Sequence, residues 1–235
     1  VTASASGTAT AIHAAEGSTV SKGQALVTLG GDDLEDKIQN AADSLRNAEL
    51  SMEDVGLFAV ANGPGSFTGL RIGISAVKGL AFALSKPCAA VSTLDAMAYN
   101  VTAYDCVVCA AMDARCNQVY VALFRVNGGK VERLTEEECL KTDEAARMLS
   151  EYDDDIMLVG DGAFIMKKAT DNEGLENVKI APDPLRYQTG YGVCLAAVNA
   201  PQLTPEQLMP MYLKLPQAQR ELMAKNAEAY KERKE

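Results

Sequence analysis

The sequence predicts an α/β fold in which helices cover sheets. Short apolar runs alternate with segments of helical periodicity from residue 55 to residue 199, and turns containing glycine lie between them. Hydrophobic residues make up 48% of the 235 residues, which is enough for a sizeable core and too much for a globally disordered chain. No apolar run approaches the roughly 20 residues that cross a bilayer, so we expect no membrane span. The first residues do not predict a signal peptide.

The first predicted elements are a strand at 55–61, a glycine-rich loop and a helix at 69–84. Asn127-Gly128-Gly129 predicts a hairpin turn between two later strands. The strands expected after the first helix are 88–91, 106–112, 119–126, 130–134, 156–159 and 178–181. The helices expected after it are 93–100, 142–152, 164–170 and 187–199.

The loop before the first predicted helix is the most informative segment of the chain. Gly63 and Gly65 flank Pro64, so the backbone can turn sharply on both sides of a fixed φ angle. Ser66 and Thr68 are both suited to cap the helix that follows. These features predict an abrupt turn from a strand into a helix.

The helix after this loop carries small residues on one side. Gly69, Gly73, Ala76 and Gly79 follow one another at spacings of four, three and three, which places them on a common face. Each glycine costs a helix roughly 1 kcal/mol against alanine, a loss that is tolerated where two backbones must pack closely. We therefore predict a partner interface on this helix. Its residues are Gly69, Arg71, Ile72, Gly73, Ala76, Gly79 and Leu80.

Phosphate binding is the alternative for the loop, because glycine-rich loops and helix N-termini can bind anions. No Gly-Lys-Ser/Thr follows the loop, so it is not a Walker loop, and Pro64 removes one amide donor. The interface interpretation is therefore favoured. In that interpretation the loop fixes the direction in which the chain enters the helix. The loop residues are Gly63, Pro64, Gly65, Ser66 and Thr68.

The six cysteines predict neither a disulfide framework nor a zinc site. Cys106 and Cys109 form a CxxC pair inside a predicted strand, where residues three apart point to opposite faces. The others have no paired spacing, and we expect scattered, buried, reduced thiols. These are Cys88, Cys116, Cys139 and Cys194.

The inventory of catalytic side chains is short, and we predict no catalytic residue and no metal site. His13 is the only histidine, so the chain beyond it can form neither a Ser-His-Asp triad nor a histidine-ligated metal centre. Asp113 and Arg115 flank a turn between two predicted strands, where an aspartate that stabilises the turn is favoured over a catalytic pair. Asp161 lies between two glycines and is interpreted in the same way.

Residues 63–73 closely resemble the hallmark segment of the TsaB family, bacterial proteins of tRNA threonylcarbamoyladenosine biosynthesis. Weaker matches follow in the family's order, and the resemblance runs from about residue 52 to about residue 221. These matches are 92–98, 112–115, 118–124, 159–163 and 210–214.

This resemblance implies an actin-like, ribonuclease-H-like fold of two lobes. Residues 51–100 would belong to the first lobe, 101–200 to the second, and 201–235 to a C-terminal tail and helix. The implied function is that of a cytoplasmic scaffold that binds and activates a catalytic paralogue, TsaD, with a TsaE ATPase joining the assembly. The tRNA would be contacted only indirectly, and a homodimer is an alternative assembly. We expect this chain to bind no cofactor by itself. ATP would be bound only within the complex.

Residues 1–50 depart from the family pattern. Residues 7–29 resemble the first half of a lipoyl-type β module of HlyD-type membrane-fusion adaptors, and 32–50 resemble the start of their coiled coil. A joined chain, in which an adaptor fragment precedes a TsaB-like body near Ser51, is one interpretation, and a diverged TsaB N-terminus is the other. If the chain is a joined one, the opening strands of the first lobe would be missing or altered.

Two functions of other classes stay open at this point. One is an actin-like ATP-dependent enzyme or peptidase, and the other is a fragment of a membrane-fusion adaptor. The net charge of −10 disfavours the chain as the main RNA-binding surface. It favours a protein that docks on a basic partner. Under the scaffold hypothesis, Gly73→Leu is expected to abolish partner binding.

Overall fold

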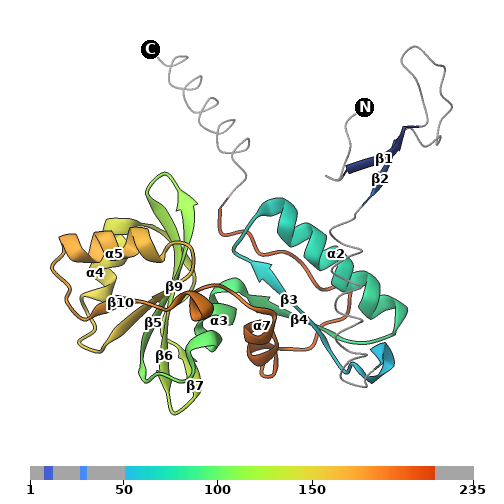
Figure 1. The fold of residues 1–235 in the computed structure, drawn as a ribbon. Helices are drawn as coiled ribbons and strands as arrows, with labels where there is room; N and C mark the ends of the chain where they lie inside the picture. The colour runs from blue at the N-terminus through green and yellow to red at the C-terminus, as the bar shows by residue number, and fades with distance from the viewer. Residues whose placement is uncertain (1–7, 13–26, 31–50, 215–235) are drawn as a thin grey trace, which may run out of the picture. The chain divides into compact units, whose positions relative to one another are not determined.

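The computed structural model describes residues 8–12, 27–30 and 51–214, and the chain divides into two compact units, residues 1–57 and 58–235 (Figure 1). In the first unit, β1 (Thr8–Ile12) and β2 (Val27–Gly30) pair antiparallel. A single 3-10 turn, η1 (Met52–Asp54), is closed by the Ser51 amide, which donates to Asp54 Oδ2 at 2.9 Å. The coiled-coil segment expected at 32–50 and the tail beyond residue 214 lie outside the described residues.

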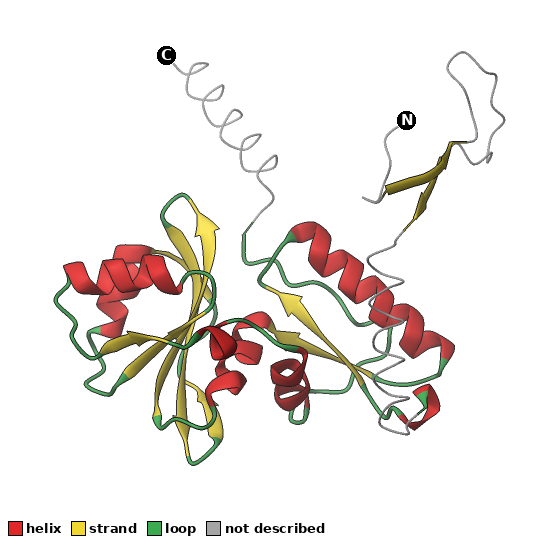
Figure 2. Ribbon diagram, viewed as in Figure 1, coloured by secondary structure: helices red, strands yellow, loops and turns green. Residues whose placement is uncertain are grey.

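The smaller sheet of the second unit consists of two parallel strands joined by a long helix. β3 (Phe58–Gly63) and β4 (Cys88–Ser92) pair from Phe58↔Cys88 to Gly63↔Ser92, with a shift of register between Ala61 and Gly63, and α2 (Phe67–Ala83) connects them. One side of α2 packs on this sheet (Figure 2), where Ile74 and Ala81 join Cys88 and Leu208 in a small core. The other side of α2 therefore stays available to solvent.

The larger sheet has six strands in the order β10-β9-β5-β6-β7, with β8 also paired to β6. The strands β5, β9 and β10 run parallel, whereas β6 is antiparallel to β5, β7 and β8. Their bounds are β5 (Cys106–Arg115), β6 (Gln118–Asn127), β7 (Lys130–Arg133), β8 (Glu138–Lys141), β9 (Ile156–Val159) and β10 (Val178–Ile180).

Helices bury both faces of the larger sheet. α4 (Thr142–Leu149) and α5 (Ala163–Asn172) pack on one face, and α3 (Thr93–Ala98) packs on the other. Cys109 faces the core under α4 and α5, whereas Cys106 packs against the core under α3. The prediction that these two cysteines point to opposite faces of a strand is thus confirmed.

The last helices attach the larger sheet to the smaller one. α6 (Asp183–Arg186) precedes α7 (Gly190–Ala197), which contacts α3, β3 and β4. Gly192 permits this contact, because a Cβ there would lie 2.2 Å from the Ala96 carbonyl oxygen. Thr189 caps α7 by accepting from the Gly192 amide, and its hydroxyl donates to Asn100 Oδ1 at 2.7 Å. No helix in the described part of the chain is long and apolar enough to cross a bilayer.

Several predicted elements need correction. The helix expected from residue 69 starts at Phe67, because Ser66, not Thr68, accepts the Gly69 amide at 3.3 Å. The helix expected at 93–100 ends at Ala98 and tightens into the 3-10 turn η2 (Tyr99–Val101). The strand β8 was not predicted at all, and it forms by pairing with residues 118–121 of β6.

Candidate partner-docking site

The solvent-facing side of α2 is a continuous surface of small and apolar residues. Its exposed positions recur at helical spacing along one side of the helix. Ile72 is 40% exposed and Phe82 is 72% exposed, whereas Ile74 and Ala81 on the sheet-facing side are buried. The positions that form this side, which we call the α2 outer face, are Thr68, Ile72, Ser75, Gly79, Phe82 and Ala83.

The predicted interface residues divide between this outer face and its margin. Gly69, Arg71, Ile72 and Gly79 are exposed, whereas Gly73, Ala76 and Leu80 are half-buried. A Cβ added to Gly79 would meet nothing within 4 Å, whereas one added to Gly73 would lie 3.7 Å from Val60 Cγ2 of β3. Gly79 therefore marks the open part of the surface, and Gly73 lies toward the sheet.

The loop before α2 is packed against the C-terminal segment of the unit. The Met211 amide donates to the Asn62 carbonyl at 2.7 Å, and Asn62 Nδ2 donates to the Met209 carbonyl at 3.3 Å. Gly63 has φ +138°, and a Cβ there would lie 2.3 Å from the Met211 carbonyl oxygen. Only glycine fits this close approach. Pro64 beside it is buried, whereas Gly65 is exposed.

Two aromatic rings and an arginine meet at the start of α2. The rings of Phe67 and Tyr212 stack with centroids 5.1 Å apart. The Arg71 guanidinium lies 4.0 Å from the centroid of the Phe67 ring, and its Nε donates to Tyr212 Oη at 2.9 Å. Phe67 and Tyr212 are still 44% and 40% exposed. Arg71 is among the residues predicted for the interface, whereas neither ring is. Tyr212 could not be connected with Arg71 from a local pattern, because the two are 141 residues apart.

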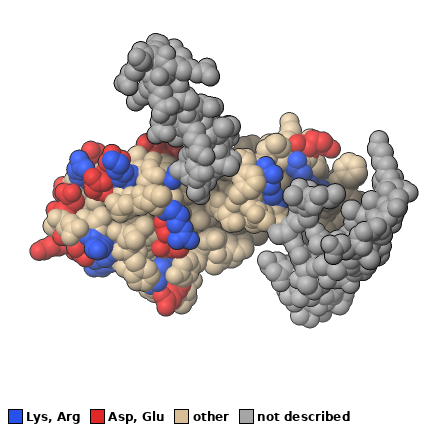
Figure 3. All heavy atoms as spheres, turned by 90° about the horizontal axis from the view of Figure 1, so that it is seen from above, with Lys and Arg blue, Asp and Glu red and all other residues tan. Residues whose placement is uncertain are grey.

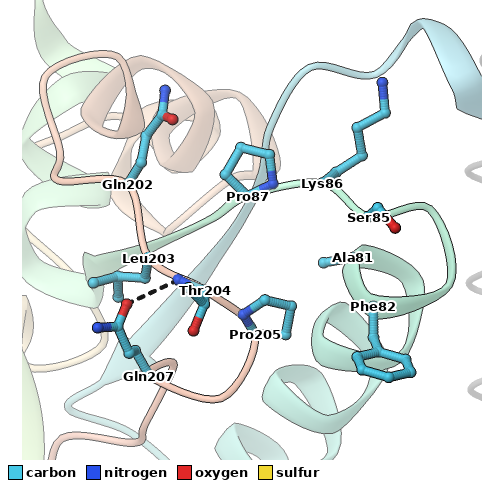
Figure 4. A pocket seen from close by; sticks show the side chains of 10 residues that line it. All are labelled: Ala81, Phe82, Ser85, Lys86, Pro87, Gln202, Leu203, Thr204, Pro205 and Gln207. Atoms are coloured by element: carbon cyan, nitrogen blue, oxygen red, sulfur yellow. Dashed lines mark hydrogen bonds between the residues drawn. The ribbon is translucent and has the colours of Figure 1, made fainter.

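A shallow groove of about 650 Å³ lies at the other end of α2 (Figure 4). Its walls are mostly apolar and include Phe82, Pro87, Leu203 and Pro205. The Thr204 amide donates to Gln207 Oε1 at 3.0 Å on one side of it. Lys86 is the single ionisable residue in its lining, so the groove offers no acid–base pair for catalysis.

The two aspartates considered for chemistry are engaged in backbone bonds. Asp113 Oδ1 accepts from the Arg115 amide at 2.7 Å, at a turn where Arg115, Cys116 and Asn117 all have positive φ. This confirms the turn-stabilising interpretation of Asp113. The expectation for Asp161 was wrong. Its Oδ1 accepts a hydrogen bond from the Asp113 amide at 3.0 Å, so its side chain bonds a neighbouring strand and not its own turn.

The cysteines do not form a reactive or metal-binding cluster in the described ranges 8–12, 27–30 and 51–214. Burial raises the pKa of the Cys109 thiol to about 12, so this group stays protonated at neutral pH. Cys116 and Cys194 are exposed, which corrects the expectation of uniformly buried thiols. Cys116 is exposed because it lies at the tip of the β5–β6 hairpin.

Relatives with curated names match parts of this chain. TsaB of Bacillus subtilis strain 168, named a tRNA threonylcarbamoyladenosine biosynthesis protein, is 32% identical over 53% of this chain and 54% of its own length. TsaB of Escherichia coli K12 is 41% identical over 35% of this chain and 37% of its own length. The chain thus spans about half the length, or less, of these relatives.

Solved structures match over more of the chain. YeaZ from Pseudomonas aeruginosa has a TM-score of 0.63 at 27% identity, covering 83% of this chain and 92% of that chain. A second structure, titled as an uncharacterized protein with similarity to peptidase YEAZ from the same organism, has the same TM-score at 25% identity and the same coverage. The chain accordingly has the actin-like, ribonuclease-H-like α/β fold, and it is similar to TsaB proteins.

The family match extends into the segment whose sequence resembles a membrane-fusion adaptor. The model of the TsaD family, described as tRNA N6-adenosine threonylcarbamoyltransferase, matches residues 34–227. It therefore includes most of the predicted coiled-coil segment at 32–50, and the HlyD-type interpretation gains no support. Because this match covers most of the chain, the protein belongs to the TsaD family.

Proposed function

We propose that this chain is a non-catalytic scaffold in the formation of threonylcarbamoyladenosine in tRNA, acting in the cytoplasm. It binds a TsaD-like catalytic paralogue through the α2 outer face and activates it. The names of the TsaB relatives and of the family support the pathway. The observation that carries the docking role is the outer face itself, which is exposed, consists of small and apolar residues, and is open above Gly79.

The side chains of residues 34–227, the segment that matches the family model, favour a scaffold role over a catalytic one. His13 is the only histidine of the chain, so residues 34–227 hold none and cannot build a histidine-ligated centre. Asp113 and Asp161 are occupied by backbone amides, and Cys109 is held as a neutral thiol. The same facts disfavour an independent ATP-dependent enzyme or peptidase. In this proposal a TsaE-like ATPase joins the complex, ATP is bound there, and tRNA is contacted indirectly.

A reconstitution assay tests this function. The purified TsaD-like paralogue and TsaE-like ATPase of the same organism are incubated with ATP, tRNA and the threonylcarbamoyl donor, with and without this chain. We expect threonylcarbamoyladenosine to accumulate only when this chain is added, and none when it is incubated without the paralogue. Modification by the paralogue at the same rate without this chain would refute the activator role. Modification by this chain without the paralogue would refute its non-catalytic nature.

A further inference from the structure

We propose that residues 203–214, which we call the C-terminal strap, hold the two sheets of the second unit at a fixed angle to each other. The strap is bonded to the smaller sheet along its length, and it reaches the larger sheet through the side chain of Lys214. The Lys214 ammonium is then a clasp that closes the strap. This inference concerns the conformation of the chain itself and does not depend on the proposed function.

The strap is anchored on the smaller sheet at three places. At its start, Leu203 and Cys88 exchange two backbone hydrogen bonds of 2.8 Å each at the beginning of β4. In its middle, Leu208 is fully buried in the small core under α2. Towards its end, the Met211 amide bonds the end of β3, and the Tyr212 ring stacks at the start of α2. These contacts make the strap part of the smaller sheet's packing, so the two move together.

The clasp joins this strap to the hairpin of β5 and β6. Lys214 Nζ donates to the Ala114 carbonyl at 3.1 Å and to Gln118 Oε1 at 2.7 Å. The register of the hairpin shifts between Asp113 and Arg115, so Ala114 has no partner in β6. Ala114 is buried, and a buried carbonyl that the strand pairing leaves out needs a donor from elsewhere in the protein. Lys214 supplies that donor from the other end of the sequence.

The strap has little slack between its last anchor and the clasp. Tyr212 is held at the start of α2, and two residues of extended chain span at most about 7 Å. The hairpin is therefore tethered close to the smaller sheet. The packing of α7 on α3, β3 and β4 is a separate attachment between the two sheets. A second attachment restricts the hinge motion that one alone would permit. A partner that contacts both sheets would then lose less entropy on binding.

The clasp does not depend on attraction between opposite charges. The chain has 32 aspartates and glutamates, and Figure 3 shows charged side chains of both signs intermixed over the part built on the larger sheet. Within the described residues, Lys214 nevertheless forms no ion pair and bonds two uncharged oxygens. Salt screens attraction between charged groups. We therefore expect the clasp to stay closed at high salt.

The test measures the distance between the two sheets in the full chain by pulsed electron resonance. Spin labels are attached through a non-natural ketone amino acid at Ser75 of α2 and Lys168 of α5, both exposed, so that the six cysteines stay unmodified. We expect one narrow distance distribution for the parent chain at low and at high salt. Lys214→Met removes both hydrogen bonds but keeps an unbranched side chain, and it should add a second, broader population.

Hydrogen exchange supplies an independent readout of the same variants. Without the clasp, the amides of residues 113–119 should exchange roughly 10-fold faster. Gln118→Leu removes one acceptor and leaves the Ala114 carbonyl, so its effect should be smaller than that of Lys214→Met. Lys130→Met is the matched control, because Lys130 is exposed on β7 and undergoes the same replacement. Thermal melting checks that every variant is folded.

Three outcomes would overturn the clasp. The first is a parent chain whose labels already give a broad distribution, because the sheets would then not be held at one angle. The second is a narrow distribution for Lys214→Met, even with faster exchange, because Lys214 would then only complete the hairpin. The third is the same broadening for Lys130→Met, which would make the loss of any surface ammonium the cause.

Discussion

Replacing Gly160 by alanine should destabilise the protein by about 3 kcal/mol or more. Gly160 follows β9 with φ +96°, and a Cβ there would lie 2.0 Å from the Ala111 carbonyl oxygen and 3.2 Å from Met97 Sδ. Ala111 belongs to the central strand β5, whose backbone is fixed by neighbours on both sides and cannot move away. The new methyl group therefore meets both a disfavoured backbone conformation and a collision with backbone. Urea-induced unfolding of the two proteins measures the loss.

Gly174→Ala provides the matched control for this prediction. Gly174 also has positive φ, +76°, but a Cβ there would meet nothing within 4 Å. It should therefore lose only about 1–2 kcal/mol, the cost of the left-handed conformation. The difference between the two variants isolates the collision with β5. Equal losses at the two positions would show that Gly160 does not approach the central strand as the structure describes.

Gly79→Leu should weaken binding to the TsaD-like paralogue by about 10- to 100-fold without harming the fold. A Cβ at Gly79 has no neighbour within 4 Å, so a leucine can extend into solvent from the α2 outer face. Leucine is also a better helix former than glycine, so the unfolding free energy should stay the same or rise by up to about 1 kcal/mol. Loss of binding by a variant at least as stable as wild type can only come from the surface.

The control for Gly79→Leu is Gly190→Leu. Gly190 is the first residue of α7, is exposed, and likewise has nothing within 4 Å of an added Cβ. We expect this variant to bind the paralogue as wild type does. Gly79 is a sharper probe than Gly73, because a leucine at Gly73 would also extend toward Val60 and disturb packing on β3. Unchanged affinity of the Gly79→Leu chain would remove α2 from the interface.

The features that were predictable from sequence are those fixed by local periodicity. The strand at 156–159 is found with the predicted bounds, since a compact apolar run ends there at a glycine turn. Cys106 and Cys109 lie on opposite faces, as the alternation of a strand requires. The Asp113 turn was also predictable, because its bond to the Arg115 amide spans only two residues.

The features that were missed depend on contacts distant in sequence. The strand β8 has only four residues among acidic neighbours, and its pairing partner on β6 decides its conformation. Asp161 looked like an ordinary turn residue, but its bond crosses to residue 113, 48 positions away. The Phe67–Tyr212 stack and the Gly63–Met211 contact arise because the C-terminal segment returns to the start of α2. No local pattern reveals that return.

Hydrogen exchange of this chain, alone and saturated with the TsaD-like paralogue, tests most directly whether α2 is the docking surface. We expect slower exchange across residues 67–83 in the complex, together with the segment around Tyr212. We expect unchanged exchange in α5 (Ala163–Asn172), which covers the larger sheet. Protection confined to α5 or another element, with residues 67–83 exchanging as in the free chain, would contradict it.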